Sequence, residues 1–521
     1  MKHICKILLL VFVVLNYSTF SQERSFEDEG LVYLKSNLEF LASDLLEGRE
    51  TGTRGTYLAS FFITSELKKY GVKPFGDNGM YFQNFNLLDR KYDESSRITI
   101  IYEKRDSEQL IIGDDFHISS EQMPSFKYSK LKKDVVFARY GIVTDDKRYN
   151  DYENIDVKGK IVLLLQGFPN VDIPFPDDDV KHTIANNMKL NSAIEQGAAG
   201  ILIIPTEGTI NYWRFIKAGA TKSSLELYSG EIDSVQREGN SIPLARLNEG
   251  AVIKLLEGEK LTYQQMKEAV EKNKIPDPFH LTNQVKFDYD YSIEIKQARN
   301  VIGLIEGSDE SLKDQYVTFS AHYDHEGIID GKIYNGADDD GSGTVTILEA
   351  ARRISLQKKN KRPILVIFHT GEEKGLLGSE YLTNNSDFVK DIVVNINMDM
   401  VGREETGEIY CIGSDKLSTE LYELVEEVNS ETSRFKLDYT YNDPFDPNRY
   451  YYRSDHYNYA KLDIPIVFFY DHMTVDYHKP TDDVEKINFP KLEKCTSLLT
   501  ELALRISNLD HKLIVDKIEE K

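Results

Sequence analysis

Three consecutive aspartates, Asp338, Asp339 and Asp340, stand in the glycine-rich stretch GADDDGSG at residues 336–343. Gathering like charges in one turn is costly unless a cation compensates for their repulsion. The stretch follows an apolar strand region and directly precedes an expected helix, so a short turn holds the carboxylates together. A bound metal is the obvious neutralising cation. The sequence therefore predicts a metal site with this acidic turn at its centre.

Further metal-binding side chains stand at the ends of four expected strands. Open α/β sheets place their sites outside the carboxyl ends of the strands, so these groups should converge with the acidic turn. A lone histidine after a strand is more often structural than a ligand, but the whole set in one domain favours a site. The expected strands and the groups after them are 316–321 with His322-Tyr323-Asp324, 364–368 with Glu372-Glu373, 392–398 with Asp399, and 464–469 with Asp471-His472 and Tyr477-His478.

The spacing of these residues suggests separate roles. Residues i and i+2 of an extended chain face the same way, so Asp324 can hold the imidazole of His322 or orient its other nitrogen. Adjacent Glu372 and Glu373 point to different sides of a turn, which lets one bind metal while the other acts as a base near an attacking water. His325 is expected not to be a ligand, because Asp324 already supports His322.

The elements that must position these residues predict a chain of several folding units, since 521 residues exceed one ordinary domain. Strands and helices alternate from about residue 300 onward, which is typical of an α/β sheet. Short apolar runs at 160–165 and 200–204 indicate a compact β-rich insert over 123–275, with a helix at 186–196. Residues 22–122 and 276–521 then form the N-terminal part and the core of the main domain.

The formal net charge of −23 argues against nucleic acid and anionic membrane surfaces as partners. Residues 1–21 have a basic start, an apolar run and small residues near the end, and they predict a cleaved secretory signal, with an uncleaved anchor as the alternative. No later stretch is long and apolar enough to insert in a membrane. We expect an exported protein, periplasmic or extracellular, in which Cys411 and Cys495 form either one bridge or two buried thiols.

Five motifs, HYDH, NGADDDGSGT, HTGEEKGLLGSEYL, NMDMVG and DYHKPTDD, resemble the zinc aminopeptidase-type metallopeptidase family. Its relatives include glutamate carboxypeptidases, transferrin receptors and glutaminyl cyclases. The stretch LASDLLEGRETGTRG…GVKP resembles the N-terminal part of that family. The stretch DYENIDVKGKIVLLLQG…SAIEQGAAGILIIP is similar to the protease-associated domain inserted in many members. The resemblance implies an α/β fold with a mixed central sheet flanked by helices and a β-rich protease-associated insert.

Carried over by position, the resemblance implies a role for each site residue. Asp339 would bridge two zinc ions, with other divalent ions possible, while Asp338 and Asp340 shape the turn. Glu372 would be the general base, and Tyr477 would donate to the developing oxyanion. The remaining implied ligands are His322 and Asp399 for one ion and Glu373 and His478 for the other, with Asp324 and Asp455 supporting them.

The function implied is hydrolysis of the first peptide bond of peptides by metal-activated water, in an aminopeptidase. A carboxypeptidase or dipeptidase of the same family is the alternative, although a glutamate-type pocket needs clustered arginines that the motifs lack. Glutaminyl cyclases work with a single zinc, which leaves the full ligand set unexplained. A non-catalytic binding protein would be expected to have lost ligands, and none is lost here. The sequence makes no prediction of oligomeric state.

Overall fold

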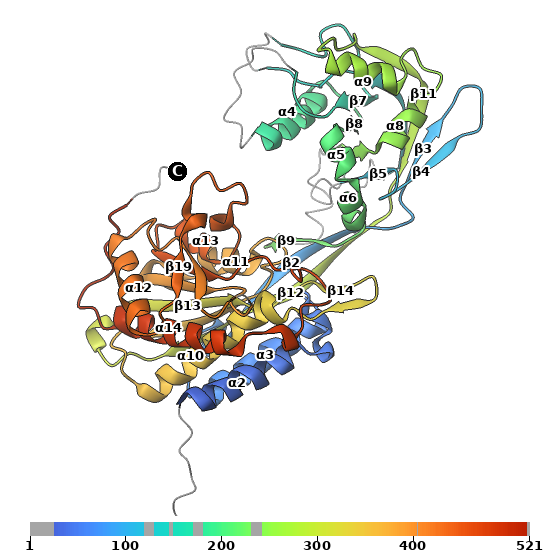
Figure 1. Ribbon diagram of the computed structural model, residues 1–521. Helices are drawn as coiled ribbons and strands as arrows, with labels where there is room; N and C mark the ends of the chain where they lie inside the picture. The colour runs from blue at the N-terminus through green and yellow to red at the C-terminus, as the bar shows by residue number, and fades with distance from the viewer. Residues whose placement is uncertain are drawn as a thin grey trace, which may run out of the picture. The chain divides into compact units, whose positions relative to one another are not determined.

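The computed structural model describes residues 26–118, 130–144, 149–169, 181–230, 242–403 and 405–517, which form two compact units (Figure 1). The first unit takes in Met1–Phe85 and Gln297–Lys521, and the second is Asn86–Lys296. The chain leaves the first unit within β2 (Phe82–Tyr92) and returns within β12 (Tyr291–Ile305). The predicted signal at 1–21 lies outside the described residues.

The first unit is built on a mixed sheet. Four neighbouring strands, β20, β17, β13 and β16, run parallel, so their carboxyl ends meet at one edge, while β12 and β18 pair antiparallel at either side. The predicted α/β class is confirmed. The strand order is β19 (Lys436–Asp438), β18 (Glu408–Ile412), β20 (Ile466–Tyr470), β17 (Ile392–Met398), β13 (Tyr316–His322), β16 (Ile364–His369) and β12, with β1 (Lys73–Pro74) paired to β12 and a separate hairpin of β14 (Gly327–Ile329) and β15 (Lys332–Tyr334).

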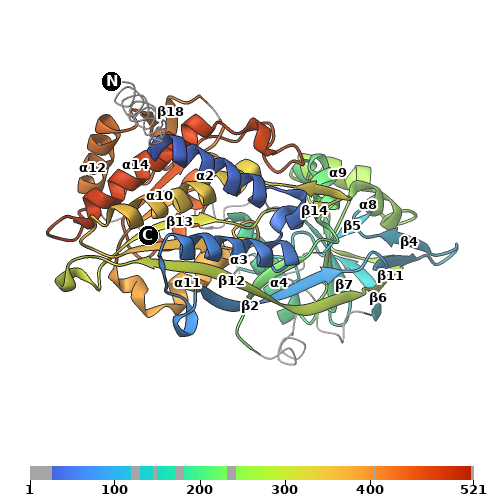
Figure 2. The ribbon, with the colours of Figure 1, turned by 90° about the horizontal axis from the view of Figure 1, so that it is seen from below.

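Helices cover both faces of this sheet, so its central strands are buried on both sides. Along β16, Ile364, Val366 and Phe368 join the core on one face, and Leu365 and Ile367 join the core on the other. Figure 2 shows α2, α10 and α14 side by side over the first face. That face carries α2 (Phe26–Leu41), α3 (Arg54–Lys69), α10 (Gly343–Gln357), α12 (Thr419–Glu431) and α14 (Phe489–Ser507), and the other carries α11 (Leu377–Asn385) and α13 (His456–Ala460).

The second unit has its own sheet and its own core. It is longer at both ends than the insert expected at 123–275, because β4 pairs with β3, β3 pairs with β11, and β5 pairs with β10. The predicted helix at 186–196 corresponds to α4. The elements are β3 (Arg97–Ile101), β4 (Glu108–Ile111), β5 (Phe116–His117), β6 (Lys130–Phe137), β7 (Ile161–Leu165), α4 (Lys181–Glu195), β8 (Gly200–Ile204), α5 (Glu207–Asn211), α6 (Trp213–Gly219), β9 (Ser224–Tyr228), β10 (Leu244–Leu247), α8 (Glu249–Leu255), α9 (Tyr263–Glu271) and β11 (Phe279–Asp288).

Two smaller expectations are also answered. Cys411 and Cys495 are both free and buried, so the chain has two buried thiols at these positions and no bridge between them. Among the described residues, no helix combines the length and apolar character that crossing a bilayer requires.

Candidate metal centre

The predicted site residues come together at the carboxyl edge of the parallel strands. His322 is the last residue of β13, Glu372 and Glu373 follow β16, and Asp399 follows β17. His478 lies in the loop after β20. The acidic turn, Ala337–Ser342, forms a single π-type turn directly before α10. All of these residues lie in the first unit.

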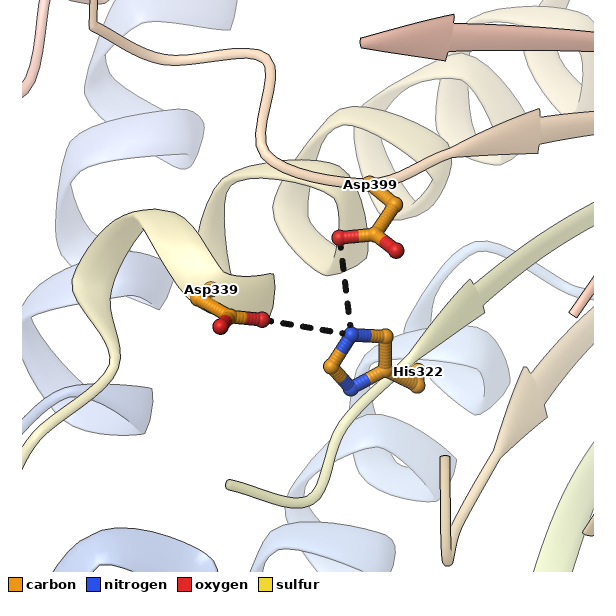
Figure 3. A group of neighbouring side chains, drawn as sticks. All are labelled: His322, Asp339 and Asp399. Atoms are coloured by element: carbon orange, nitrogen blue, oxygen red, sulfur yellow. Dashed lines mark ion pairs between the residues drawn. The ribbon is translucent and has the colours of Figure 1, made fainter. Parts of the chain in front are cut away.

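One group consists of His322, Asp339 and Asp399. Figure 3 shows the imidazole of His322 between the two carboxylates. Its Nε2 lies 3.4 Å from Asp339 Oδ1 and 3.5 Å from Asp399 Oδ1. This Nε2 atom is buried without a hydrogen-bond partner. Since Nδ1 lies 3.1 Å from the carbonyl oxygen of Asp324, the ring can donate there and keep the Nε2 lone pair for a metal.

A second group shares Asp339 with the first. His478 Nε2 lies 3.2 Å from Asp339 Oδ2 and 3.0 Å from Glu373 Oε2, and it too is buried without a hydrogen-bond partner. The two oxygens of Asp339 therefore face two different histidines. Imidazole nitrogens and carboxylate oxygens are the donors that zinc accepts in catalytic sites. The first group therefore fits a divalent cation, and the second offers the same kinds of donor.

The carboxylates of the two groups also raise the pKa of both histidines. Burial lowers the pKa of His322, but the charges of Glu372 and Asp399 outweigh it and hold that pKa well above its ordinary range. Burial also lowers the pKa of His478, yet the neighbouring carboxylates of Asp339 and Glu373 raise it to about 11. Excess carboxylate charge therefore surrounds both rings. A divalent cation would compete with protons for the same positions.

The flanking aspartates shape the turn, as predicted. Asp338 accepts a hydrogen bond from the backbone N–H of Gly402 at 2.9 Å. Asp340 accepts from the backbone N–H of Gly343 at 2.8 Å and of Met400 at 3.1 Å. Asp340 and one oxygen of Asp338 thus bind the backbone, and Asp339 faces the histidines.

Asp482 is a site residue that the sequence reasoning missed. Its carboxylate accepts from the backbone N–H of Asp338 at 3.0 Å and of Asp339 at 3.1 Å, and Arg403 Nη1 lies 3.4 Å from it. It therefore fixes the backbone of the acidic turn. The available signal was its place four residues after His478, within DYHKPTDD.

Arg49 is a second residue that was missed. Its guanidinium is fully buried and donates to the carbonyls of Tyr323 at 2.8 Å, Asn335 at 2.6 Å and Gly336 at 2.9 Å. In the sequence it stands in LASDLLEGRETGTRG, a stretch noted only for its resemblance to the N-terminal part of the family. Because these carbonyls flank His322 and the acidic turn, the N-terminal segment holds both site loops in place.

The structure assigns contacts to the two supporting aspartates that differ from those expected. The carboxylate of Asp324 lies 3.8 Å from His322 Nδ1, and it accepts instead from Thr51 Oγ1 at 2.6 Å and from the backbone N–H of Glu372 at 3.3 Å. Asp455 is fully buried, which raises its pKa to about 7. Its neighbour Ser454 is the residue that donates to Asp399 Oδ2, at 2.6 Å.

Asp471, one of the groups after β20, does not join the ligand groups. Its Oδ1 lies 2.5 Å from Lys491 Nζ in a fully buried ion pair, and its Oδ2 accepts from the backbone N–H of Arg403 at 2.8 Å. It anchors α14 to the strand end.

Glu372 and Tyr477 line a pocket beside the two groups. Burial raises the pKa of Glu372 well above its usual range, and the charges of Asp399 and Glu373 add to this effect. Burial, followed by the charges of Asp339 and Glu373, also raises the pKa of Tyr477, so its phenol keeps its proton. The rest of the pocket is mostly apolar, with Met400, Tyr450, Arg453, Phe468, Tyr470 and Met473 in its wall.

Residues 300–503 match the family model described as Peptidase family M28. This segment belongs to peptidase family M28. The predicted family is confirmed, and the M28 segment contains every predicted ligand as well as Glu372 and Tyr477.

Individual relatives agree with this assignment. The chain is 28% identical over 244 residues to a probable leucine aminopeptidase of Trichophyton verrucosum, covering 41% of this chain and 65% of that protein. It is 30% identical over 259 residues to aminopeptidase YwaD of Bacillus subtilis, covering 48% of this chain and 49% of that protein. The chain therefore spans less than two thirds of the length of these two relatives.

A solved structure shares the fold over nearly the whole chain. The aminopeptidase from Aneurinibacillus sp. strain AM-1 superimposes with a TM-score of 0.56 at 18% identity, covering 94% of this chain and 96% of that one. At this identity the likeness concerns the fold alone.

Proposed function

We propose that this chain is an exported di-zinc aminopeptidase that releases N-terminal residues from peptides. The observation that carries the proposal is the position of Asp339, whose two oxygens face the unpartnered Nε2 atoms of His322 and His478. A carboxylate shared in this way suits two cations at the roughly 3.5–4 Å separation of two-metal sites. Asp399 and Glu373 each add a carboxylate to one histidine.

The residues of the pocket supply the remaining chemistry. When bound, two zinc ions polarise the scissile carbonyl and make water more acidic. Glu372 would take a proton from the attacking water and pass it to the leaving amine, because burial raises its pKa and makes its carboxylate a stronger base. The protonated phenol of Tyr477 donates a hydrogen bond to the oxyanion. The apolar wall receives the side chain of the N-terminal residue.

The exported location is supported by residues 1–21, whose basic, apolar and small-residue order is that of a secretory signal. Peptides in the periplasm or medium would then be the substrates.

The carboxypeptidase alternative is favoured by one observation. Arg453 lines the same pocket, and its Nη2 lies 3.5 Å from the hydroxyl of Tyr477. A guanidinium in this place could bind a substrate carboxylate. Any assay of the chain must therefore offer both peptide ends.

The bridging role of Asp339 has a direct test. Asp339→Ala removes a ligand from both groups, so zinc measured by elemental analysis should fall from two ions per chain to less than one. Asp338→Asn is the matched control. It keeps an oxygen acceptor for Gly402 and should retain both ions. Full zinc occupancy in Asp339→Ala would contradict the bridging role.

A further inference from the structure

Two residues that directly follow Asp324 contact the second group. His325 Nδ1 lies 2.7 Å from Glu373 Oε1, and Glu326 Oε1 lies 3.4 Å from His478 Nδ1. Glu373 and His478 are the two members of that group besides Asp339. The dipeptide therefore offers one contact to each of them.

The contact from His325 commits one oxygen of Glu373. At 2.7 Å the two atoms are within hydrogen-bond distance, so the N–H at Nδ1 of His325 can donate to Oε1. The other oxygen, Oε2, stays 3.0 Å from His478 Nε2, where a shared cation would lie.

The position of the His325 ring is built into the fold. The side chain is fully buried, and its backbone N–H donates to the carbonyl of Arg49 at 3.2 Å. Gly336, in the left-handed region at φ +58°, packs against the ring: a Cβ there would lie 2.5 Å from His325 Cγ. Only glycine leaves room for this imidazole beside the acidic turn.

The carboxylate of Glu326 lies beside Nδ1 of His478, the ring nitrogen that faces away from Asp339 and Glu373. Glu326 Oε2 lies 3.6 Å from Lys374 Nζ, which holds the carboxylate from its other side. A carboxylate at Nδ1 favours the tautomer that keeps the Nε2 lone pair free for a metal.

We propose that His325 and Glu326 are positioning residues for the second ion: His325 makes Glu373 a one-oxygen ligand, and Glu326 fixes the tautomer of His478. The proposal rests on the two-ion function above. The first group has different supports, because Asp324 holds His322 through its carbonyl and Ser454 holds Asp399. Loss of His325 and Glu326 should therefore lower the affinity for one ion and leave the affinity for the other unchanged.

The test is stepwise binding of Zn²⁺ to the metal-free full chain. Calorimetry measures the affinity of each step, and elemental analysis counts the bound ions. His325→Leu and Glu326→Leu should each lower the binding affinity for one of the two ions by roughly 10- to 100-fold, the range seen when a residue that supports a ligand is removed. The affinity of the other ion should stay at the wild-type value. His325→Asn, whose amide nitrogen can take the place of Nδ1, should retain most of the affinity.

Two controls separate positioning from general damage. Glu50→Gln removes the other carboxylate near Lys374, with Oε1 at 3.9 Å, without touching His478, and should leave both ions unchanged. If His325→Leu does not fold, the comparison of His325→Asn with His325→Gln replaces it, since glutamine places its amide nearer the position of Nε2 and should not restore binding.

Two outcomes overturn the proposal in distinguishable ways. If wild type binds two ions and His325→Leu binds both with wild-type affinity, the positioning role is wrong while the proposed function stands. If wild type binds fewer than two ions, the two-ion function fails, and the role of the pair fails with it.

Discussion

Glu372 and Glu373 are adjacent in sequence but lie in opposite electrostatic surroundings. Glu373 contacts two histidines, and its pKa falls to about 2 in spite of its burial. Glu372 faces the pocket, and burial together with the charges of Asp399, Glu373 and Asp455 raises its pKa. One carboxylate is suited to stay ionised as a ligand and the other to exchange a proton. In the proposed function, Glu373 is therefore the ligand and Glu372 the base.

Glu372→Gln should therefore lower turnover by at least roughly a hundredfold, because glutamine cannot accept the proton of the attacking water. Zinc content should remain at two ions, since Glu372 is outside both ligand groups. Steady-state kinetics on an aminoacyl anilide together with elemental analysis measures both quantities. Glu373→Gln is the contrasting variant, expected to lose an ion as well as activity. Near-normal turnover in Glu372→Gln would show that Glu372 is not the general base.

At the scale of elements, the parallel strands β13 and β17 carry polar residues where a buried sheet is otherwise apolar. Asn395 Nδ2 donates to Ser320 Oγ at 2.9 Å, and Ser320 Oγ donates to Asn397 Oδ1 at 2.6 Å. Asn397 Nδ2 donates to Ser454 Oγ at 2.9 Å, which donates to Asp399. Buried polar groups of this kind must be paired. The chain of donors ends on a metal-group carboxylate and orients it.

The sequence predicted the strands and the acidic turn because apolar runs and glycine turns are local signals. It also placed the site residues at strand ends, because parallel strands share one carboxyl edge. It could not predict Ser454 or Arg49 as site residues, since their roles depend on contacts between segments far apart in the chain. For Asp482 the only sequence signal was its place shortly after His478. The sequence predicts only that His325 is not a ligand, because Asp324 supports His322, and its contact with Glu373 depends on the loop after β16.

In the second unit, a buried lysine in α4 should make stability depend on pH. Lys189 is buried and donates to the carbonyls of Tyr140 at 2.7 Å and Leu165 at 2.9 Å. Burial lowers its pKa from 10.5 to about 7. Between these two pH values the unfolded chain holds a proton that the folded chain lacks, so the free energy of unfolding rises with pH in this window. The slope from this group is at most about 1.4 kcal/mol per pH unit.

Lys189→Met should remove that slope. Urea unfolding of wild type and variant at pH 7, 8 and 9 measures it, and the fluorescence of Trp213, the single tryptophan, reports on the second unit. Lys158→Met, at an exposed position of the same unit, is the control. Parallel stability curves for wild type and Lys189→Met would contradict the argument.

At the scale of the whole molecule, each of the two units has its own hydrophobic core, and the candidate metal centre lies in one of them. The candidate metal centre lies entirely in the first unit, on four strand ends and the acidic turn. The second unit keeps its sheet and helices around its own buried residues. The net charge of −23 fits an acidic protein that attracts cations such as zinc and protonated N-termini. The chemistry proposed here is therefore a property of the first unit.

One measurement tests the central claim most directly. The zinc-loaded chain from residue 22 onward is offered peptides with a free N-terminus, the same peptides N-acetylated, and peptides with a C-terminal glutamate, with Glu372→Gln as the inactive control. The account predicts release of N-terminal residues from the free peptides alone, and none from the acetylated ones. Cleavage confined to the C-terminal glutamyl bond, or no cleavage by the two-zinc protein, would contradict it.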